Sequence, residues 1–184
     1  MTFKPFHDPT HLYFITATLL GWKQLFVRPA YAQLVLDSLA WHRQTGRWAL
    51  YAWVLMPNHL HAMIKPLGDH TTSSVLKSFG SFTAHAILRR LNDEGLNDWL
   101  AFFAERRDKD VNKEHQIWQP IQAKNVVSRE FLQEKLEYIH NNPVAKKWNL
   151  AAERALYEYS SACYYDRSIE PLVAVDDIRE WLRP

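Results

Sequence analysis

Residues 53–64 read Trp-Val-Leu-Met-Pro-Asn-His-Leu-His-Ala-Met-Ile. The apolar run before the Pro-Asn pair and the alternating run after it predict two strands joined by a tight turn. Side chains alternate between the two faces of a sheet along a strand, so His59 and His61 should project together while Leu60 faces the other way. Two imidazoles on one face can bind one metal ion.

A His-x-His triplet is weak support for a metal site when it stands alone. With nine His in 184 residues, about 0.4 such triplets arise by chance in this composition. Two half-buried strand histidines that only make hydrogen bonds would give the same pattern. The metal-binding interpretation therefore needs support from another part of the chain.

A second informative segment covers residues 128–143, Ser-Arg-Glu-Phe-Leu-Gln-Glu-Lys-Leu-Glu-Tyr-Ile-His-Asn-Asn-Pro. Ser128 is a favourable N-cap, and apolar residues recur at helical spacing, which predicts an amphipathic helix. Tyr138 and Asn142 are four residues apart and therefore share one face of that helix. Pro143 disfavours a helical residue before it, so the helix should end or loosen there. A tyrosine hydroxyl and an amide oxygen are thus presented together near a helix end.

Four short motifs follow one another along the chain. They are Met56-Pro57-Asn58-His59-Leu60-His61, Trp118-Gln119-Pro120, Tyr138-Ile139-His140-Asn141-Asn142-Pro143-Val144 and Tyr159-Ser160-Ser161-Ala162. In this order they resemble the REP-associated tyrosine transposases, part of the wider superfamily of HUH single-strand endonucleases. The resemblance covers roughly residues 10–165, and the two central motifs are specific. Residues 145–148, Ala-Lys-Lys-Trp, depart from the Gly-containing continuation of many relatives, which bears on DNA contacts more than on catalysis.

The resemblance implies a role for each residue of the site. His59 and His61 would be metal ligands, Asn142 would be the third ligand, and Tyr138 would be the nucleophile. Such a ligand set leaves coordination positions open and suits Mg²⁺ or Mn²⁺ as the cofactor. Attack by the tyrosine on DNA would give a 5′-phosphotyrosine and a free 3′-hydroxyl, and the reverse step would transfer the strand. The expected function is a metal-dependent single-stranded DNA endonuclease and strand transferase acting on hairpin-forming repeat DNA.

Three polar residues close to these motifs are further candidates. Asn58, Glu137 and His140 could hold a ligand in place or handle a proton. An ordinary polar residue at a turn or a helix end would look the same. The sequence does not identify a general base.

A net charge of +2 is only mildly basic, so binding of nucleic acid would depend on local clusters of charge. Arg89-Arg90 and Lys146-Lys147 are such clusters, and the lysine pair is favoured for DNA because it follows Tyr138 closely. A solvated face is the alternative explanation for any of them. Eight Trp could also stack on unpaired bases, although most Trp in a chain of this size pack in the core.

The composition favours one globular core. The chain has 184 residues, of which 47% are hydrophobic, and a single Cys163 that cannot form an internal disulfide. It contains no apolar run of about 18 residues and no N-terminal signal pattern. We therefore expect a cytoplasmic, nucleoid-associated protein with DNA as its partner and neither a membrane nor a small molecule as its target.

The order of the expected elements indicates the fold class. They are a strand at 11–19, a helix at 30–45, the two strands around Pro57-Asn58, a helix at about 73–90, a strand at 116–122 and the helix that carries Tyr138. This order is the ferredoxin-like split βαβ pattern, an α+β fold, and it agrees with the HUH endonuclease fold that the resemblance implies. We expect an antiparallel sheet with helices on one face, which leaves the other face for DNA and the histidines. On the helix at 73–90, Val75, Phe79, Phe82 and Ala86 should face the core.

The expected domain covers residues 1–165 and is followed by a tail at 166–184. Residues 92–115 surround an apolar Trp99-Leu100-Ala101-Phe102-Phe103 with charge, which predicts a short helix inserted in a polar connection. In the tail, residues 172–175 could add an edge strand, and a turn of helix should follow at 176–182.

Other interpretations stay open. A domesticated nuclease would cleave without mobilising DNA, and a non-catalytic nucleic-acid-binding module would use the same fold without needing the four residues of the site, all of which are present. A hydrolase with a metal-activated water would not need the tyrosine, but the chain lacks an evident carboxylate ligand motif. A monomer is favoured because residues 145–165 could pack the tyrosine helix within one chain, and a homodimer is the alternative.

Overall fold

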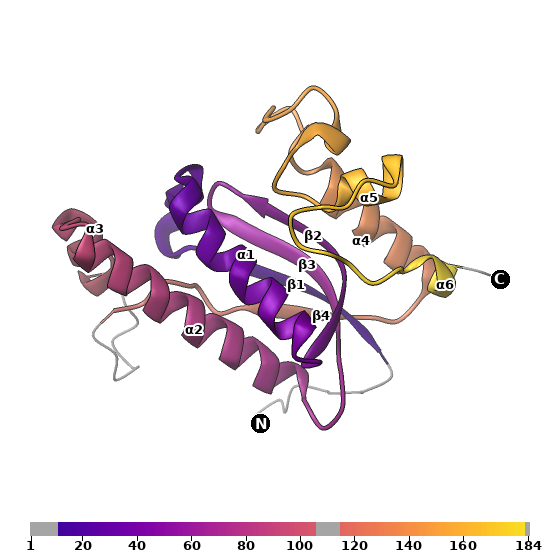
Figure 1. Cartoon of the computed structure of the whole chain (residues 1–184), viewed down its shortest axis with the longest axis horizontal. Coiled ribbons are helices and arrows are strands. Elements are labelled where there is room, and N and C mark those ends of the chain that lie inside the picture. Colours follow the sequence, from indigo (N-terminus) through magenta and orange to yellow (C-terminus); the bar gives the residue numbers. More distant parts are fainter. Residues whose placement is uncertain (1–10, 106–114, 183–184) are drawn as a thin grey trace.

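The computed structural model of the chain describes residues 11–105 and 115–182 (Figure 1). Its centre is a sheet with the strand order β2-β3-β1-β4, in which all neighbours are antiparallel. The strands are β1 (Leu12–Thr18), β2 (Trp48–Met56), β3 (His59–Pro66) and β4 (Gln122–Val126). The helices are η1 (Leu20–Trp22), η2 (Leu25–Val27), α1 (Pro29–Gln44), α2 (Thr72–Asp93), α3 (Asn97–Glu105), α4 (Arg129–Asn141), η3 (Arg154–Leu156), α5 (Ala162–Arg167) and α6 (Arg179–Leu182). This topology confirms the predicted ferredoxin-like α+β fold.

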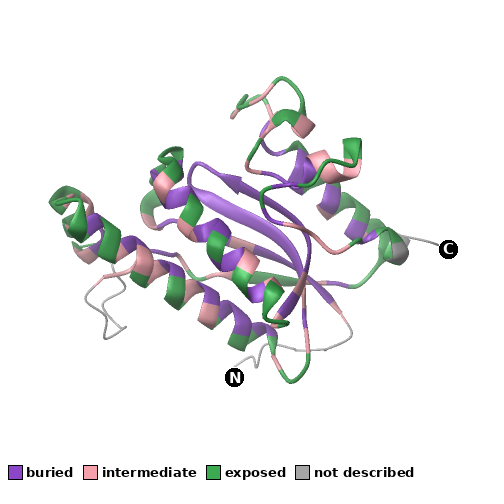
Figure 2. Ribbon diagram, in the orientation of Figure 1, coloured by how far each residue is buried: buried purple, intermediate pink, exposed green. Residues whose placement is uncertain are grey.

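Helices α1 and α2 lie side by side across one face of the sheet (Figure 1). The sheet beneath them is buried, whereas the outer sides of both helices are exposed (Figure 2). The strand residues that face these helices alternate along β1 and β3, as predicted. They are Tyr13, Ile15, Ala17, Leu60, Ala62 and Ile64.

The second face of the sheet differs from the expectation, because α4 packs on it. Leu132, Leu136 and Ile139 of α4 share a core with strand residues such as Phe14 and Met63. Helices therefore cover both faces, which explains why β1 and β2 are apolar on both sides. The sheet face that carries His59 and His61 is therefore partly covered, and α4 lies along one side of the two histidines.

The strand predicted at 116–122 is displaced along the chain, since β4 begins only at Gln122. Ile117 and Trp118 are buried in the core under α1 and α2. An isolated bridge between Trp118 and Leu19 and a few backbone hydrogen bonds, such as that from the Leu20 N–H to the Ile117 carbonyl at 2.8 Å, join this segment to β1 and the turn after it. Pro120 also lacks the N–H that a ladder needs. The true strand has a polar, exposed sequence that carries little strand signal.

The tail does not form the edge strand that residues 172–175 suggested. Asp176 covers part of the outer edge of β2 instead: the Leu50 N–H donates to Asp176 Oδ2 at 2.8 Å, and the Asp176 N–H donates to the Leu50 carbonyl at 2.7 Å. The Trp53 indole also donates to the Val173 carbonyl, at 2.9 Å. A short helix follows at α6, slightly later than expected. These contacts protect an edge that could otherwise pair with another chain.

The helix predicted at 73–90 is present as α2, but Phe82 is exposed and Thr83 is buried. The Thr83 hydroxyl donates to the Phe79 carbonyl at 2.7 Å and accepts from Trp118 Nε1 at 2.9 Å. A threonine whose hydroxyl is fully bonded can occupy the core, and a hydrophobic pattern does not reveal this.

The predicted insertion at 92–115 contains the expected short helix as α3, and its residues 106–114 lie outside the described residues. In the described ranges, no helix combines the length and apolar content needed to cross a membrane.

Candidate active site

Strand β3 presents His59 and His61 on the side of the sheet where α4 lies, as the alternation predicts. Their ring centroids are 4.7 Å apart. Both side chains are buried, and β3 lies between β1 and β2, so its backbone is paired on both sides. The two imidazoles are therefore held on a rigid support.

The side chain of Asn58 fixes the tautomer of His59. Asn58 Nδ2 donates to the Trp22 carbonyl at 3.1 Å, which turns Oδ1 toward His59 Nδ1 at 2.6 Å. An amide oxygen can only accept, so His59 Nδ1 carries the proton and Nε2 keeps its lone pair. His61 Nδ1 lies 2.9 Å from Thr16 Oγ1. Both hydrogen bonds use Nδ1, which leaves Nε2 of each ring for a ligand.

Burial keeps both imidazoles neutral at pH 7. It lowers the pKa of His59 to about 4, and the charge of Lys147 adds to the shift. The pKa of His61 falls to about 3, again mainly through burial. The neutral form is the one that binds a metal ion.

Tyr138 lies beside this pair. Its ring centroid is 5.1 Å from that of His61 and 6.0 Å from that of Phe14. The side chain is 45% exposed, and no described residue forms a hydrogen bond with its hydroxyl. The predicted nucleophile is therefore next to the predicted metal ligands and open to a substrate.

A cavity of about 280 Å³ lies at Tyr138. It is lined by Phe14, Thr16, His61, Gln122, Lys124, Lys135 and Tyr138. Lys135 Nζ lies 5.6 Å from the centroid of the Tyr138 ring. The cavity thus combines a phenol, an imidazole and two ammonium groups.

The two cavity lysines escaped the sequence analysis for different reasons. Lys135 precedes Tyr138 by three residues, a spacing that places both on one side of a helix and could have identified it. Lys124 could not be found because the last strand was expected at 116–122, and the sequence does not show that β4 runs beside β1.

Asn142, the implied third ligand, follows α4 and is buried. The helix ends before it, as predicted, but Asn142 itself keeps helical angles (φ −56°, ψ −45°) despite the proline that follows. Among the described residues, its side-chain amide makes no hydrogen bond. An amide that has no hydrogen-bond partner in the protein is available to bind a ligand.

These donors fit a divalent cation in their chemistry, with two neutral imidazoles and an unpaired amide. Among the described residues, no group of three His, Cys, Asp or Glu could hold a metal. A third protein ligand at this site would therefore be an oxygen of another kind, such as an amide, hydroxyl or backbone carbonyl oxygen, and such ligands are compatible with Mg²⁺ or Mn²⁺.

The sequence matches no family model and no curated protein. Among solved structures, a REP-associated tyrosine transposase bound to a REP hairpin aligns with 97% of this chain and 93% of its own, at 18% identity and a TM-score of 0.64. The chain has the fold of this transposase. A candidate transposase from Deinococcus radiodurans R1 aligns with 77% of this chain and 95% of its own, at 15% identity and a TM-score of 0.47.

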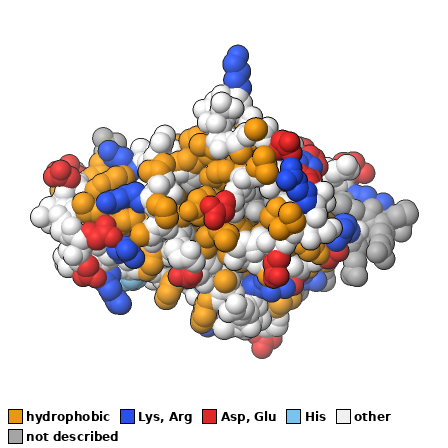
Figure 3. Space-filling view, turned by 45° about the horizontal axis from the view of Figure 1, so that its top comes forward, with side chains coloured by type: hydrophobic (Ala, Val, Ile, Leu, Met, Phe, Trp, Pro, Cys, Tyr) orange, Lys and Arg blue, Asp and Glu red, His pale blue; other side chains and the backbone are white. Residues whose placement is uncertain are grey.

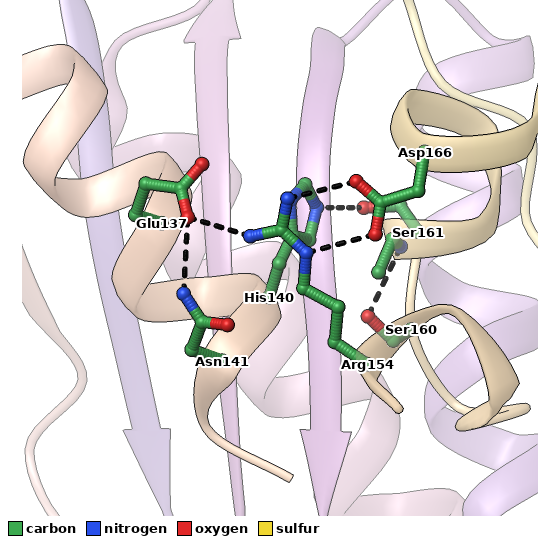
Figure 4. A network of polar contacts seen from close by, with 8 residues as sticks. Glu137, His140, Asn141, Arg154, Ser160, Ser161 and Asp166 are labelled. Carbon is green, nitrogen blue, oxygen red and sulfur yellow. Dashed lines mark hydrogen bonds and ion pairs between the residues drawn. The ribbon is translucent and has the colours of Figure 1, made fainter. Parts of the chain in front are cut away.

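In this transposase fold, His140 belongs to a polar network and is not among the residues that line the cavity (Figure 4). Its Nε2 lies 3.0 Å from Ser161 Oγ, and burial lowers its pKa to about 4. Beside it, Arg154 donates to Glu137 at 2.6 Å and to Asp166 at 2.8 Å. The network joins α4 to α5, which gives His140 and Glu137 a structural role.

The predicted DNA-binding residues lie in two places on the transposase fold. Lys146 and Lys147 are exposed in the turn after α4, and Lys147 is close enough to lower the pKa of His59. Arg89 and Arg90 are on α2, across the sheet from the histidines, so the structure does not bring them to the cavity.

On the face in Figure 3, basic side chains are interspersed with acidic ones. That mixture agrees with the small net charge of +2.

Proposed function

We propose that this protein cleaves and rejoins single-stranded DNA beside a hairpin, as a tyrosine transposase, with Tyr138 as its nucleophile. The observation that carries the proposal is the 5.1 Å separation of the Tyr138 and His61 rings at one cavity. The transposase of matching fold is bound to a REP hairpin, which supports hairpin-forming DNA as the substrate.

In the proposed step, Tyr138 Oη forms a bond to phosphorus as the bond from phosphorus to the 3′-oxygen breaks. The phenol loses its proton, and the leaving 3′-oxygen gains one. The products are a 5′-phosphotyrosine and a free 3′-hydroxyl. A second 3′-hydroxyl can attack the same phosphorus and release the tyrosine, which rejoins DNA without an external energy source.

Lys124 and Lys135 would bind the phosphate from the cavity wall and stabilise the charge that develops there. A divalent ion held by His59, His61 and Asn142 would reduce the repulsion between the phosphate oxygens and the attacking phenolate. Asn58 would keep His59 in the tautomer that binds this ion.

We infer that one chain supplies the whole site. Tyr138 and the histidines lie together within this single chain, and the Arg154 network together with Leu136 and Ile139 holds α4 on its own sheet. A monomer would then be able to perform the chemistry.

A denaturing gel tests the proposal. Wild type, Tyr138→Phe and the control Tyr164→Phe would be incubated with labelled hairpin oligonucleotides from the flanking genomic DNA, with Mn²⁺, Mg²⁺ or EDTA. We expect a protein-linked DNA band that needs metal, is kept in Tyr164→Phe and is absent in Tyr138→Phe.

Two other results would contradict the proposal in distinct ways. Tight hairpin binding with neither adduct nor cleavage would indicate a binding module. Cleavage that survives in Tyr138→Phe would mean that water is the nucleophile.

A further inference from the structure

Trp22 has a backbone conformation that residues other than glycine rarely adopt. Its φ is 58°, directly after Gly21 at 64°. A side chain with a Cβ is strained in this left-handed region. The Trp22 side chain is also 59% exposed, so burial of the ring does not offset the strain. A bulky, exposed residue held in a strained conformation indicates a functional constraint.

The surrounding structure holds this turn firmly. The Trp22 carbonyl accepts from Asn58 Nδ2 at 3.1 Å, and the Leu19 N–H donates to the Asn58 carbonyl at 2.9 Å. A Cβ added to Gly21 would lie only 2.6 Å from the Phe102 ring, so the turn packs closely against α3. The indole is thus presented on a rigid support.

Trp22 is also at one end of a row of rings that reaches the proposed nucleophile. The centroid distances are 6.3 Å from Trp22 to His59, 4.7 Å from His59 to His61 and 5.1 Å from His61 to Tyr138. A DNA strand with its phosphate at Tyr138 could continue past the histidines to the indole.

We propose that Trp22 stacks on an unpaired base of the DNA strand, a few nucleotides from the phosphate that Tyr138 attacks. The proposal rests on the proposed function and assigns a base-binding site to it. An indole accepts any base because every base has a π-face. This stacking would fix the position of the strand along the cavity.

A thermodynamic cycle between protein and DNA tests the proposal. The dissociation constants of wild type, Trp22→Ala, Trp22→Phe and the control Trp41→Ala would be measured by fluorescence anisotropy in EDTA. The DNA would be a hairpin with an unpaired extension, either intact or with one abasic site moved through the extension. Trp41 is a suitable control because it is also exposed and lies on α1, across the sheet.

We expect Trp22→Ala to weaken binding of the intact DNA by about 5- to 150-fold. One abasic position should weaken wild-type binding similarly, and Trp22→Ala should cause no further loss on that DNA. Trp22→Phe should retain most of the affinity, and Trp41→Ala should match wild type.

Trp22→Gly separates stacking from folding. Glycine adopts a positive φ without strain, so this variant should melt at the same or a higher temperature than wild type. It should nevertheless lose the coupling, which is the extra loss of affinity that the critical abasic position causes in wild type but not in a protein without the indole. Coupling that survives in Trp22→Gly would overturn the proposal.

Unchanged affinity in Trp22→Ala, or an equal loss at every abasic position, would also overturn it. So would a wild type that does not bind the DNA. The adduct assay distinguishes the two proposals: an adduct without Trp22 coupling refutes only the stacking, and coupling without an adduct refutes only the chemistry.

Discussion

Asn58 connects two parts of the site, the turn at Trp22 and His59, through one side chain. Its amide binds the Trp22 carbonyl on one side and His59 Nδ1 on the other. The same residue therefore holds the strained turn and sets the protonation of a proposed metal ligand. Its position directly before the histidine explains why the sequence pointed to it.

Asn58→Ala should reduce the affinity for Mn²⁺ by about 10- to 100-fold, because His59 would lose the partner that fixes its tautomer and ring orientation. Titration calorimetry with Mn²⁺ measures this directly. Asn92→Ala, on the exposed side of α2, is the matched control. Equal Mn²⁺ affinity in Asn58→Ala and wild type would show that the amide does not support a metal ligand.

At the scale of elements, α4 carries the proposed nucleophile and has two attachments. Its apolar side packs on the sheet through Leu132, Leu136 and Ile139. Its polar side is tied to α5 by Arg154, which bridges Glu137 and Asp166. The Arg154 side chain is 26% exposed, so solvent screens these ion pairs only in part.

Arg154→Met should lower the free energy of unfolding by about 1–3 kcal/mol, because it removes charged hydrogen bonds from both helices. Urea denaturation measures the change. Arg167→Met is the control, since the ion pair of Arg167 with Glu153 is more exposed and should contribute less than about 0.5 kcal/mol. Equal losses in the two variants would mean that the Arg154 bridge does not stabilise α4.

The sequence predicted most elements because hydrophobic periodicity dominates where one side is buried. The two strands around the Pro-Asn turn and the helix capped by Ser128 are present. The predictions that failed concern the second face of the sheet, which α4 covers, and also edges and single positions. Strand β4 is exposed and polar, so its sequence carries little strand signal. The tail binds β2 through hydrogen bonds without forming a strand. On α2, Thr83 is buried in the core and Phe82, which was expected there, is exposed.

The candidate site was predictable only in part. Alternation placed His59 and His61 on one face, and helical spacing placed Tyr138 near Asn142. The meeting of the histidines with Tyr138 depends on α4 crossing the second face of the sheet, which local patterns do not encode. The resemblance to a family supplied that link.

At the scale of the whole molecule, burial lowers the pKa of four histidines of the described ranges. They are His42, His59, His61 and His140. Each is neutral in the folded protein at a pH where the unfolded chain already binds a proton. The contribution of these neutral rings to the free energy of unfolding is fully present above about pH 6.5. It is lost as the pH falls toward the pKa values of the folded state.

The free energy of unfolding should therefore decrease between about pH 6.5 and pH 4, by on the order of several kcal/mol in total. Urea denaturation across this range measures the slope. His42→Gln should make the slope shallower, because it removes one buried neutral imidazole, although the absolute stability also falls. A flat profile in wild type would contradict the burial of neutral histidines.

The proposed function depends on Tyr138 reaching a phosphodiester beside the histidines. Mass spectrometry of the protein-linked DNA tests this most directly. After incubation with hairpin DNA and Mn²⁺, the adduct would be digested with protease and nuclease, and the nucleotide-bearing peptide would be sequenced. We expect the nucleotide on Tyr138, with no such peptide in EDTA or in His61→Ala. A nucleotide on another tyrosine, or the same adduct in His61→Ala, would contradict the proposed active site.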